Sequence, residues 1–322
     1  MTEPDIAVLR QKVHGMSPSL YGEKLRERLP DHEIAVASTP EAERDLIADA
    51  RVATGITFDS DWLEKASNLE LFACAYAGTG HLDIASFEER GIAVTNAAGV
   101  HGPNISEYVI GTLIAHERQF KRAWKQQEDA HWAAYPVGEL QGSTAAIVGL
   151  GAIGRALTDR LHAFGVDTVG VRYTPEKGGP TDEVVGFDAV HDALAGADYV
   201  ILACPLTDTT EGLIDADALA SMPTDAYLVN VARGPVVDTD ALVTALRDID
   251  IAGATLDVTD PEPLPADHPL WSFENVHITP HNAGNTPNYY DRLANILAEN
   301  VRLMEETGTA QGLTNQVVDG QR

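Results

Sequence analysis

Short apolar runs alternate with amphipathic segments along most of the chain. In the first half, apolar runs at residues 33–37, 52–55 and 69–75 are separated by segments that place apolar residues at helical spacing. Strands that alternate with helices are typical of a parallel sheet covered by helices on both faces. Because 322 residues suffice for two ordinary domains, we predict an α/β protein with two Rossmann-like or flavodoxin-like parallel-sheet domains.

A long helical pattern, from residue 105 to about residue 126, separates the two halves of the chain. Asn104 is the expected N-cap of this helix, and Glu107 stands at the capping-box position. Another helical pattern covers residues 286–306 near the end of the chain. The remaining tail is polar and lacks periodicity, so it is expected to be either packed or disordered.

These two helical patterns suggest how the domains divide the sequence. The last helix leads the chain back to the first domain, which should therefore be discontinuous. We expect a substrate domain formed by residues 1–98 and 286–322, interrupted by a dinucleotide-binding domain of residues 99–285.

A glycine motif organises the second domain. A buried apolar run at residues 145–148 leads into Gly149, Gly151 and Gly154, and a helical pattern follows. This G-x-G-x-x-G between a strand and a helix is typical of dinucleotide-binding units. Gly149 is expected to form the tight turn, Gly151 to admit the pyrophosphate, and Gly154 to let helix and strand pack closely. A tight turn that binds no cofactor is the alternative interpretation.

The residue that ends the following strand bears on the choice of cofactor. An acidic side chain usually stands there in NAD sites and binds the ribose 2′-hydroxyl. Arg172 occupies this position and is followed by Tyr173 and Thr174. Since a guanidinium pairs well with a 2′-phosphate, we expect NADP, with NAD as the second choice. Stacking of Arg172 on the adenine is the alternative.

Polar clusters follow several apolar runs in the second half, and three residues stand out among them: Arg233, Glu262 and His281. Carboxyl ends of parallel strands meet at one edge of a sheet, so these residues should converge beside the cofactor. Reduction of a 2-oxo acid needs a cation for the carboxylate and carbonyl, which suits Arg233, and a proton donor, which suits His281. Glu262 would orient that imidazole and favour its charged form. Taken singly, each residue also fits an ordinary surface role.

A glycine-containing loop, Ala77-Gly78-Thr79, follows an apolar run of the first half. Nearby glycines allow backbone N–H groups to point at an anion, so this loop is a candidate cradle for a substrate carboxylate. An ordinary strand-to-helix loop explains it equally well.

Acidic residues exceed basic ones by 49 to 22, which gives a net charge of −27. Such a surface disfavours nucleic acid and anionic membranes as partners. No signal peptide and no membrane-spanning run is seen, so a cytoplasmic protein is expected. A dispersed acidic excess with few lysines suggests a very salty cytoplasm, as in a halophile. Stability that improves as salt is lowered would contradict this hypothesis.

The two cysteines, Cys74 and Cys204, lie in apolar runs. Their spacing matches neither a metal site nor a disulfide framework. We interpret both as small buried hydrophobic residues and expect no metal site.

The chain resembles the D-isomer-specific 2-hydroxyacid dehydrogenases over nearly its whole length. The motifs that carry this resemblance are residues 149–154, 205–207, 229–238, 257–264, 269–271 and 275–284. The resemblance implies hydride transfer between NADP(H) and a small 2-oxo acid or D-2-hydroxy acid. His281 and Glu262 would be the acid/base pair, and Arg233 would bind the carboxylate and carbonyl.

The resemblance also implies the contacts of the bound molecules. Ala77, Gly78 and Thr79 would hold the substrate together with Arg233 and His281, and Asp257 would bind the nicotinamide carboxamide. The implied cofactor-binding residues are Gly149, Gly151, Ala152, Ile153, Gly154, Arg172, Tyr173, Thr174, Cys204, Pro205, Thr210, Val231, Ala232, Arg233, Asp257, His281 and Gly284. A homodimer built on the cofactor domains, and closure of the two domains over substrate, are implied as well.

Two departures from the family pattern are visible. Arg172 replaces the acidic residue usual in NAD-using members, and Thr259 stands where an aromatic residue is common. The related formate dehydrogenases carry glutamine at the position of Glu262, so formate oxidation is disfavoured.

Three alternatives remain open. The same fold could serve as a glyoxylate or hydroxypyruvate reductase, or as a phosphoglycerate dehydrogenase, although many members of that last group carry a C-terminal extension. A cofactor-binding scaffold without catalysis, similar to corepressors of this fold, is the third.

Overall fold

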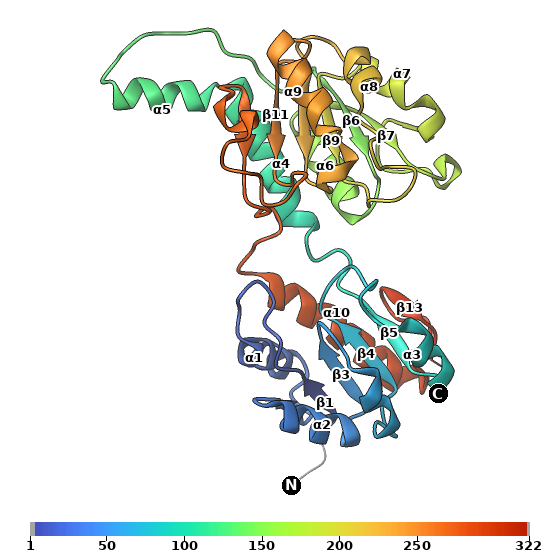
Figure 1. Cartoon of the computed structure of the whole chain (residues 1–322). Helices are drawn as coiled ribbons and strands as arrows, with labels where there is room; N and C mark the ends of the chain where they lie inside the picture. The colour runs from blue at the N-terminus through green and yellow to red at the C-terminus, as the bar shows by residue number, and fades with distance from the viewer. Residues whose placement is uncertain (1–3, 321–322) are drawn as a thin grey trace. The chain divides into compact units, whose positions relative to one another are not determined.

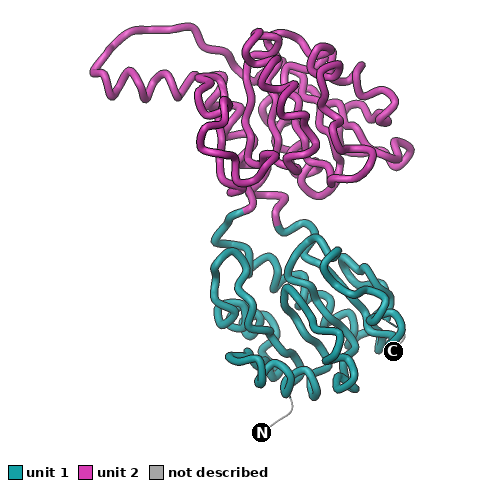
Figure 2. Tube along the Cα trace, in the orientation of Figure 1, with its two compact units in different colours: residues 1–100, 285–322 teal, residues 101–284 magenta. Residues whose placement is uncertain are grey.

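The computed structural model describes residues 4–320 and forms two compact units. Unit 1 contains the residues up to 100 and those from 285 onward, and unit 2 contains residues 101–284 (Figure 2). The chain thus passes from one unit to the other twice. The boundaries expected from the sequence lie two residues and one residue away from these.

Unit 1 contains a six-stranded sheet with the order β13-β5-β4-β3-β1-β2. Its strands are β1 (Ile6–Val8), β2 (Ile34–Val36), β3 (Val52–Gly55), β4 (Leu71–Cys74), β5 (Ala93–Thr95) and β13 (Gln316–Val318). Its helices are α1 (Pro18–Arg28), α2 (Pro40–Asp49), the 3-10 helix η1 (Ser60–Glu64), α3 (Ile84–Arg90) and α10 (Tyr289–Thr307). All strand pairs are parallel except that of β13 with β5.

Both faces of this sheet are buried, because alternate residues of each strand point to opposite sides. Ile6 and Val8 belong to the core formed with α1 and α10, whereas Ala7 belongs to the core formed with α2, η1 and α3. This two-sided burial explains why the strands are apolar runs without polar alternation.

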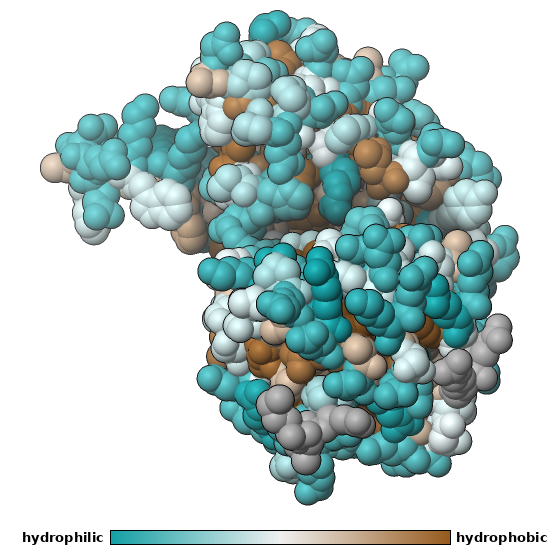
Figure 3. Space-filling view, turned by 60° about the horizontal axis from the view of Figure 1, so that its bottom comes forward, coloured by the Kyte–Doolittle hydropathy of each residue, from teal (hydrophilic) through white to brown (hydrophobic). Residues whose placement is uncertain are grey.

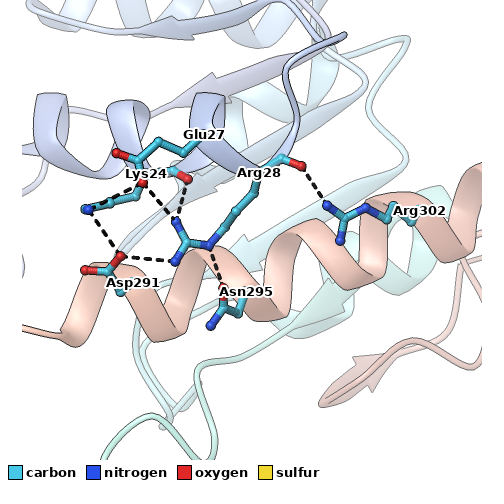
Figure 4. A network of polar contacts seen from close by, with 6 residues as sticks. All are labelled: Lys24, Glu27, Arg28, Asp291, Asn295 and Arg302. Carbon is cyan, nitrogen blue, oxygen red and sulfur yellow. Dashed lines mark hydrogen bonds and ion pairs between the residues drawn. The ribbon is translucent and has the colours of Figure 1, made fainter.

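The last helix, α10, is tied to the first by polar contacts (Figure 4). Asp291 of α10 lies 3.0 Å from Arg28 and 3.2 Å from Lys24 of α1. Arg28 also donates to Asn295, and Arg302 donates to the backbone carbonyl of Arg28. These contacts join segments more than 260 residues apart in the sequence, so the chain end completes unit 1.

Unit 2 contains a seven-stranded sheet with the order β12-β11-β10-β9-β6-β7-β8, in which every pair is parallel (Figure 1). Its strands are β6 (Thr144–Val148), β7 (Asp167–Val171), β8 (Glu183–Val185), β9 (Tyr199–Leu202), β10 (Tyr227–Asn230), β11 (Gly253–Leu256) and β12 (Val276–Ile278). Its α-helices are α4 (Gly102–Glu117), α5 (Phe120–Glu128), α6 (Ala152–Ala163), α7 (Val190–Ala195), α8 (Ala216–Ser221) and α9 (Thr239–Asp248). Its 3-10 helices are η2 (Pro175–Lys177), η3 (Phe187–Ala189), η4 (Gly234–Val236) and η5 (Pro269–Ser272).

Helices cover both faces of this second sheet. Side chains of α4 and α6 pack against one face, and those of α7, α8 and α9 pack against the other. Together the two units confirm the predicted fold class of two Rossmann-like, largely parallel-sheet domains, one of them discontinuous.

Two local predictions were wrong. The helix expected at residues 105–126 is broken into α4 and α5, with Gln119 between them at φ +50°. α4 begins earlier than expected, so His101 is its N-cap residue, and Asn104 lies inside the first turn.

The aperiodic tail is packed, because it includes β13, the edge strand of unit 1.

The surface visible in Figure 3 is predominantly hydrophilic, in keeping with the large excess of acidic residues. None of the helices formed within residues 4–320 combines the length and the apolar character needed to cross a bilayer. Both cysteines are buried and unpaired, as their interpretation from the sequence requires. Burial raises the pKa of the Cys204 thiol to about 11, which keeps it neutral near pH 7.

Candidate active site

The glycine turn between β6 and α6 shows why each glycine is needed. Gly149 has φ +104°, and a Cβ there would lie 2.7 Å from the carbonyl oxygen of Ala203. A Cβ on Gly154 would lie 2.1 Å from the carbonyl oxygen of Gly149. Gly151 differs, because a Cβ there meets no heavy atom within 4 Å. Two glycines therefore serve packing, and the third opens onto free space.

Gly151 is also the N-cap residue of α6, and its lack of a side chain leaves the helix start without a side-chain cap. The N–H groups of Ala152 and Ile153 belong to the first turn, where a helix offers no internal acceptors. Unbonded N–H groups and the helix dipole favour an anion at this position. These features are compatible with a phosphate at the turn, and the pyrophosphate contact stays a prediction from the sequence.

The strand order places this turn at a switch point of the sheet. β6 has β7 on one side and β9 on the other, and the chain crosses over in opposite directions from there. Ligands of open parallel sheets bind at such points, beyond the carboxyl ends of the strands. The predicted cofactor and catalytic residues follow β7, β6, β9, β10, β11 and β12, so they share one edge.

Arg233 follows β10 in a turn that Asn230 holds in shape. The Asn230 side chain accepts from the Ala232 N–H at 3.0 Å and donates to the Arg233 carbonyl at 3.0 Å. A Cβ on the next residue, Gly234, would lie 2.0 Å from the carbonyl oxygen of Thr259. The Arg233 turn therefore packs directly on the loop that leads from β11 to Glu262. The exposed guanidinium donates to the Ala232 carbonyl through Nη1, and it has further donors besides.

Glu262 and His281 are in direct contact. Nδ1 of His281 lies 2.8 Å from Oε1 of Glu262. A carboxylate only accepts, so Nδ1 carries the hydrogen. Both side chains are nearly half exposed, and the structure shows no partner for Nε2 of His281 among residues 4–320. That nitrogen is thus available to a ligand.

Asp257, which directly follows β11, organises the turn that carries His281. It is only 3% exposed. Its Oδ1 accepts from the Asn282 N–H at 2.8 Å, and its Oδ2 accepts from the Ala283 N–H at 2.9 Å. Its carbonyl accepts from the His281 N–H at 2.8 Å. Asp257 is therefore bonded to the histidine turn, while its expected contact with a nicotinamide stays a prediction.

Arg172 follows β7, as predicted. Its backbone N–H donates to Val185 of β8, and its guanidinium donates to the carbonyl of Gly178 through Nη1. Tyr173 is 80% exposed, and Thr174 precedes η2. The loop therefore presents a guanidinium and an aromatic ring at the end of β7, with no carboxylate before Glu176.

The other predicted cofactor residues lie at the same edge but are mostly buried. Cys204, Thr210, Val231 and Ala232 are each less than a tenth exposed, whereas Pro205 is exposed. The Thr210 hydroxyl donates to the Pro205 carbonyl at 2.6 Å, so it shapes the loop after β9. Gly284, the last residue of unit 2, packs beside the His101 ring.

The loop predicted to hold a carboxylate lies in unit 1, after β4. Asn96 donates to the carbonyl of Ala77 at 2.9 Å, and a Cβ on Gly78 would meet no heavy atom within 4 Å. Within residues 4–320, no acceptor is seen for the N–H groups of Gly78 and Thr79. The backbone of this loop is thus open to a ligand.

Sequence reasoning missed two side chains that support the site. Asn104 donates to the carbonyl of Ala283 at 2.8 Å, so it braces the histidine turn instead of capping α4. The Tyr108 hydroxyl lies 2.6 Å from the hydroxyl of Thr279. The four-residue spacing of Asn104 and Tyr108 was the available signal, but it is weak because α4 carries other polar side chains, such as Ser106 and Glu107.

Comparisons with known proteins show the family of the chain. The family model described as D-isomer specific 2-hydroxyacid dehydrogenase, NAD binding domain, matches residues 110–283. A glyoxylate reductase of Thermofilum pendens is 37% identical over 269 residues, which cover 81% of this chain and 79% of that protein.

Two solved structures resemble the whole chain. A D-isomer specific 2-hydroxyacid dehydrogenase family protein from Aeromonas salmonicida has a TM-score of 0.78 at 30% identity, covering 98% of this chain and 99% of its own. A D-isomer specific 2-hydroxyacid dehydrogenase from Xanthobacter autotrophicus Py2, in complex with NADPH and MES, has a TM-score of 0.77 at 27% identity, covering 98% of each chain. The chain belongs to the D-isomer specific 2-hydroxyacid dehydrogenase family, whose members are NAD(P)-dependent oxidoreductases.

Proposed function

We propose that this protein reduces small 2-oxo acids to D-2-hydroxy acids and prefers NADPH as the hydride donor. The contact between Glu262 and His281, with Nε2 of His281 left open, is the observation that carries this proposal. We take this pair as the proton donor and its stabilising carboxylate, because both residues follow strands at the edge where ligands of such sheets bind.

Each residue of this edge has a definite task in the reaction. The Arg233 guanidinium binds the substrate carboxylate and polarises the carbonyl. His281 gives the proton on Nε2 to the carbonyl oxygen, while Glu262 accepts the Nδ1 hydrogen bond and stabilises the imidazolium. A nicotinamide cofactor held by this domain would supply the hydride that the carbonyl carbon needs. One proton and one hydride convert the 2-oxo acid into a 2-hydroxy acid.

The charge of unit 1 supports an anionic substrate. Among the described residues, the loops that follow β1 to β5 contain two acidic residues, Asp59 and Asp83, which are the N-cap residues of η1 and α3. This acid content is low for a chain with a net charge of −27. It lowers the repulsion that a carboxylate would otherwise meet. We therefore assign the backbone of Ala77, Gly78 and Thr79 to the substrate carboxylate.

The cofactor fits the residues present. Gly151 opens onto free space at the start of α6, so a pyrophosphate could reach the N–H groups of Ala152 and Ile153. Arg172, with its neighbours Tyr173 and Thr174, would hold the adenosine end, and its free guanidinium donors suit a 2′-phosphate. The NADPH in the Xanthobacter relative supports the same preference.

An exposed arm supports a homodimer built on unit 2. α5 has no buried residue, and it projects with the following segment from the rest of unit 2 (Figure 1). Trp124 is 58% exposed, Trp132 is fully exposed, and Phe120 is exposed as well. Large apolar side chains gathered on one exposed segment are typical of protein–protein contact. We propose that a second copy of the chain covers this arm.

The first prediction concerns the acid/base pair. Replacing His281 by asparagine should lower kcat for 2-oxo acid reduction by about 100-fold or more, because the general acid is lost. Glu262→Gln should lower kcat less, since the imidazole stays but its charged form is less stabilised. The assay follows NADPH oxidation with a panel of 2-oxo acids that includes glyoxylate, hydroxypyruvate and phosphohydroxypyruvate.

His277→Asn is the matched control, because this histidine lies on β12 with an exposed side chain. Its rate should equal that of the unchanged protein. Near-normal reduction by His281→Asn would contradict the acid assignment. Negligible turnover of every acid at millimolar concentration would favour the scaffold alternative instead.

The second prediction separates the two kinds of glycine. Gly151→Ala should keep the fold, because the added methyl group enters open space, but it should raise the dissociation constant for NADPH about tenfold, or about 1.4 kcal/mol. Gly154→Ala should lower the melting temperature, because its Cβ would overlap the Gly149 carbonyl. Fluorescence titration and thermal unfolding measure the two effects. Unchanged NADPH affinity in Gly151→Ala would argue against a cofactor at this turn.

The third prediction concerns cofactor choice. Arg172→Gln retains a donor for Gly178 but loses the charge, so kcat/KM for NADPH should fall by about 10- to 100-fold, with little change for NADH. Arg247→Gln, in the last turn of α9, also removes one positive charge. It should leave the ratio of kcat/KM for NADPH to kcat/KM for NADH unchanged. Equal or better rates of the unchanged protein with NADH than with NADPH would refute the role given to Arg172.

The fourth prediction tests the arm. The protein should have twice the chain mass of 34.5 kDa in light scattering, and Trp124→Ser with Trp132→Ser should shift it towards the monomer. Ile249→Ser removes an isolated exposed apolar side chain of the same unit and should leave the mass unchanged. A monomeric unchanged protein would contradict the dimer.

A further inference from the structure

Helix α4 braces the turn that carries His281 at two points. Asn104 donates to the carbonyl of Ala283 at 2.8 Å, and the hydroxyl of Tyr108 lies 2.6 Å from that of Thr279. Residues four apart share one face of a helix. One face of α4 therefore holds both ends of the turn, residues 279–283.

The directions of the hydrogen bonds follow from the groups involved. Thr279 has one hydroxyl hydrogen and lies 2.5 Å from Oδ1 of Asp257, whose carboxylate only accepts. Thr279 therefore donates to Asp257, and the Tyr108 hydroxyl must donate to Thr279. The result is a directed chain from Tyr108 through Thr279 to Asp257.

This chain ends on the group that shapes the histidine turn. The Asp257 carboxylate accepts the N–H groups of Asn282 and Ala283 as well, and it is almost completely buried. His281 itself has φ +51°, a conformation that a non-glycine residue holds only when its surroundings enforce it. Burial raises the pKa of the Tyr108 phenol, so it remains a donor at neutral and moderately alkaline pH.

We propose that Tyr108 is a positioning residue for proton transfer: its hydroxyl directs Thr279 onto Asp257 and so fixes the His281 imidazole against Glu262. The proposal rests on the proposed function, because it takes His281 to be the proton donor. Without the Tyr108 hydroxyl, the Thr279 hydrogen is no longer directed to Asp257 alone. The turn then gains alternative positions, and the proton is delivered from a poorly aligned imidazole.

A purely structural role for Tyr108 would predict something different, and unit 2 offers a matched control. The Tyr227 hydroxyl lies 2.9 Å from that of Thr255, on the neighbouring strands β10 and β11. This tyrosine–threonine pair is buried and that of Tyr108 is partly buried, but no hydrogen bond links the Tyr227 pair to Asp257. Tyr227→Phe and Tyr108→Phe should therefore cost similar stability, and only Tyr108→Phe should impair the reaction.

The experiment compares the unchanged protein with Tyr108→Phe, Tyr227→Phe and His281→Asn. In Tyr108→Phe, kcat for 2-oxo acid reduction should fall about 10- to 100-fold, while the dissociation constant for NADPH stays the same. The solvent deuterium isotope effect on kcat should rise, because proton delivery becomes slower. Tyr227→Phe should match the unchanged protein in all three measurements.

The outcomes separate this inference from the proposed function. If His281→Asn is inactive but Tyr108→Phe keeps its rate and isotope effect, the inference is overturned and the proposed function stands. If Tyr108→Phe and Tyr227→Phe lose activity equally, with no change in isotope effect, the role is structural and the inference is overturned. If His281→Asn remains active, the acid assignment fails, and the inference fails with it.

Discussion

Parallel pairing throughout the sheet of unit 2 is the constraint on which the site depends. Since every described strand of that sheet runs in one direction, the loop after each strand lies at the same edge. Arg233, Glu262 and His281 follow three adjacent strands, β10, β11 and β12, although they are far apart in the sequence. The glycine turn follows β6 in the same sheet. One topological rule thus brings dispersed residues to a single edge of the sheet.

The second requirement is close approach between the backbones of neighbouring loops, and it explains why glycine stands at two positions. Gly149 faces the carbonyl of Ala203, and Gly234 faces that of Thr259, at distances that leave no room for a Cβ. The first approach draws the loops after β6 and β9 together. The second presses the Arg233 turn onto the loop that carries Glu262. Glycine at these two positions therefore serves contact between strand-end loops, whereas Gly151 leaves space for a ligand.

Much of this arrangement could be predicted from the sequence, because it depends on local pattern. The strands are continuous apolar runs, and the glycine spacing and the chemistry of Arg233, Glu262 and His281 are legible without coordinates. The supports were harder to predict, since they depend on tertiary contact. The sequence alone predicts Asn104 as an N-cap. In the structure its side-chain amide donates to the carbonyl of Ala283, which lies near the other end of unit 2 in the sequence. Likewise, β13 has no periodicity because three residues at a sheet edge are too few to show any.

Around His281, the backbone is held rigidly and the side chain is exposed. A buried carboxylate loses its hydration, and Asp257 compensates with hydrogen bonds from Thr279, Asn282 and Ala283. Those bonds fix the backbone on both sides of His281, so the imidazole needs no dense packing of its own. The ring is accordingly half exposed, with one nitrogen on Glu262 and the other open. The proposed acid must be both immobile and reachable. In this structure the backbone of the turn supplies the first property, and the exposed side chain supplies the second.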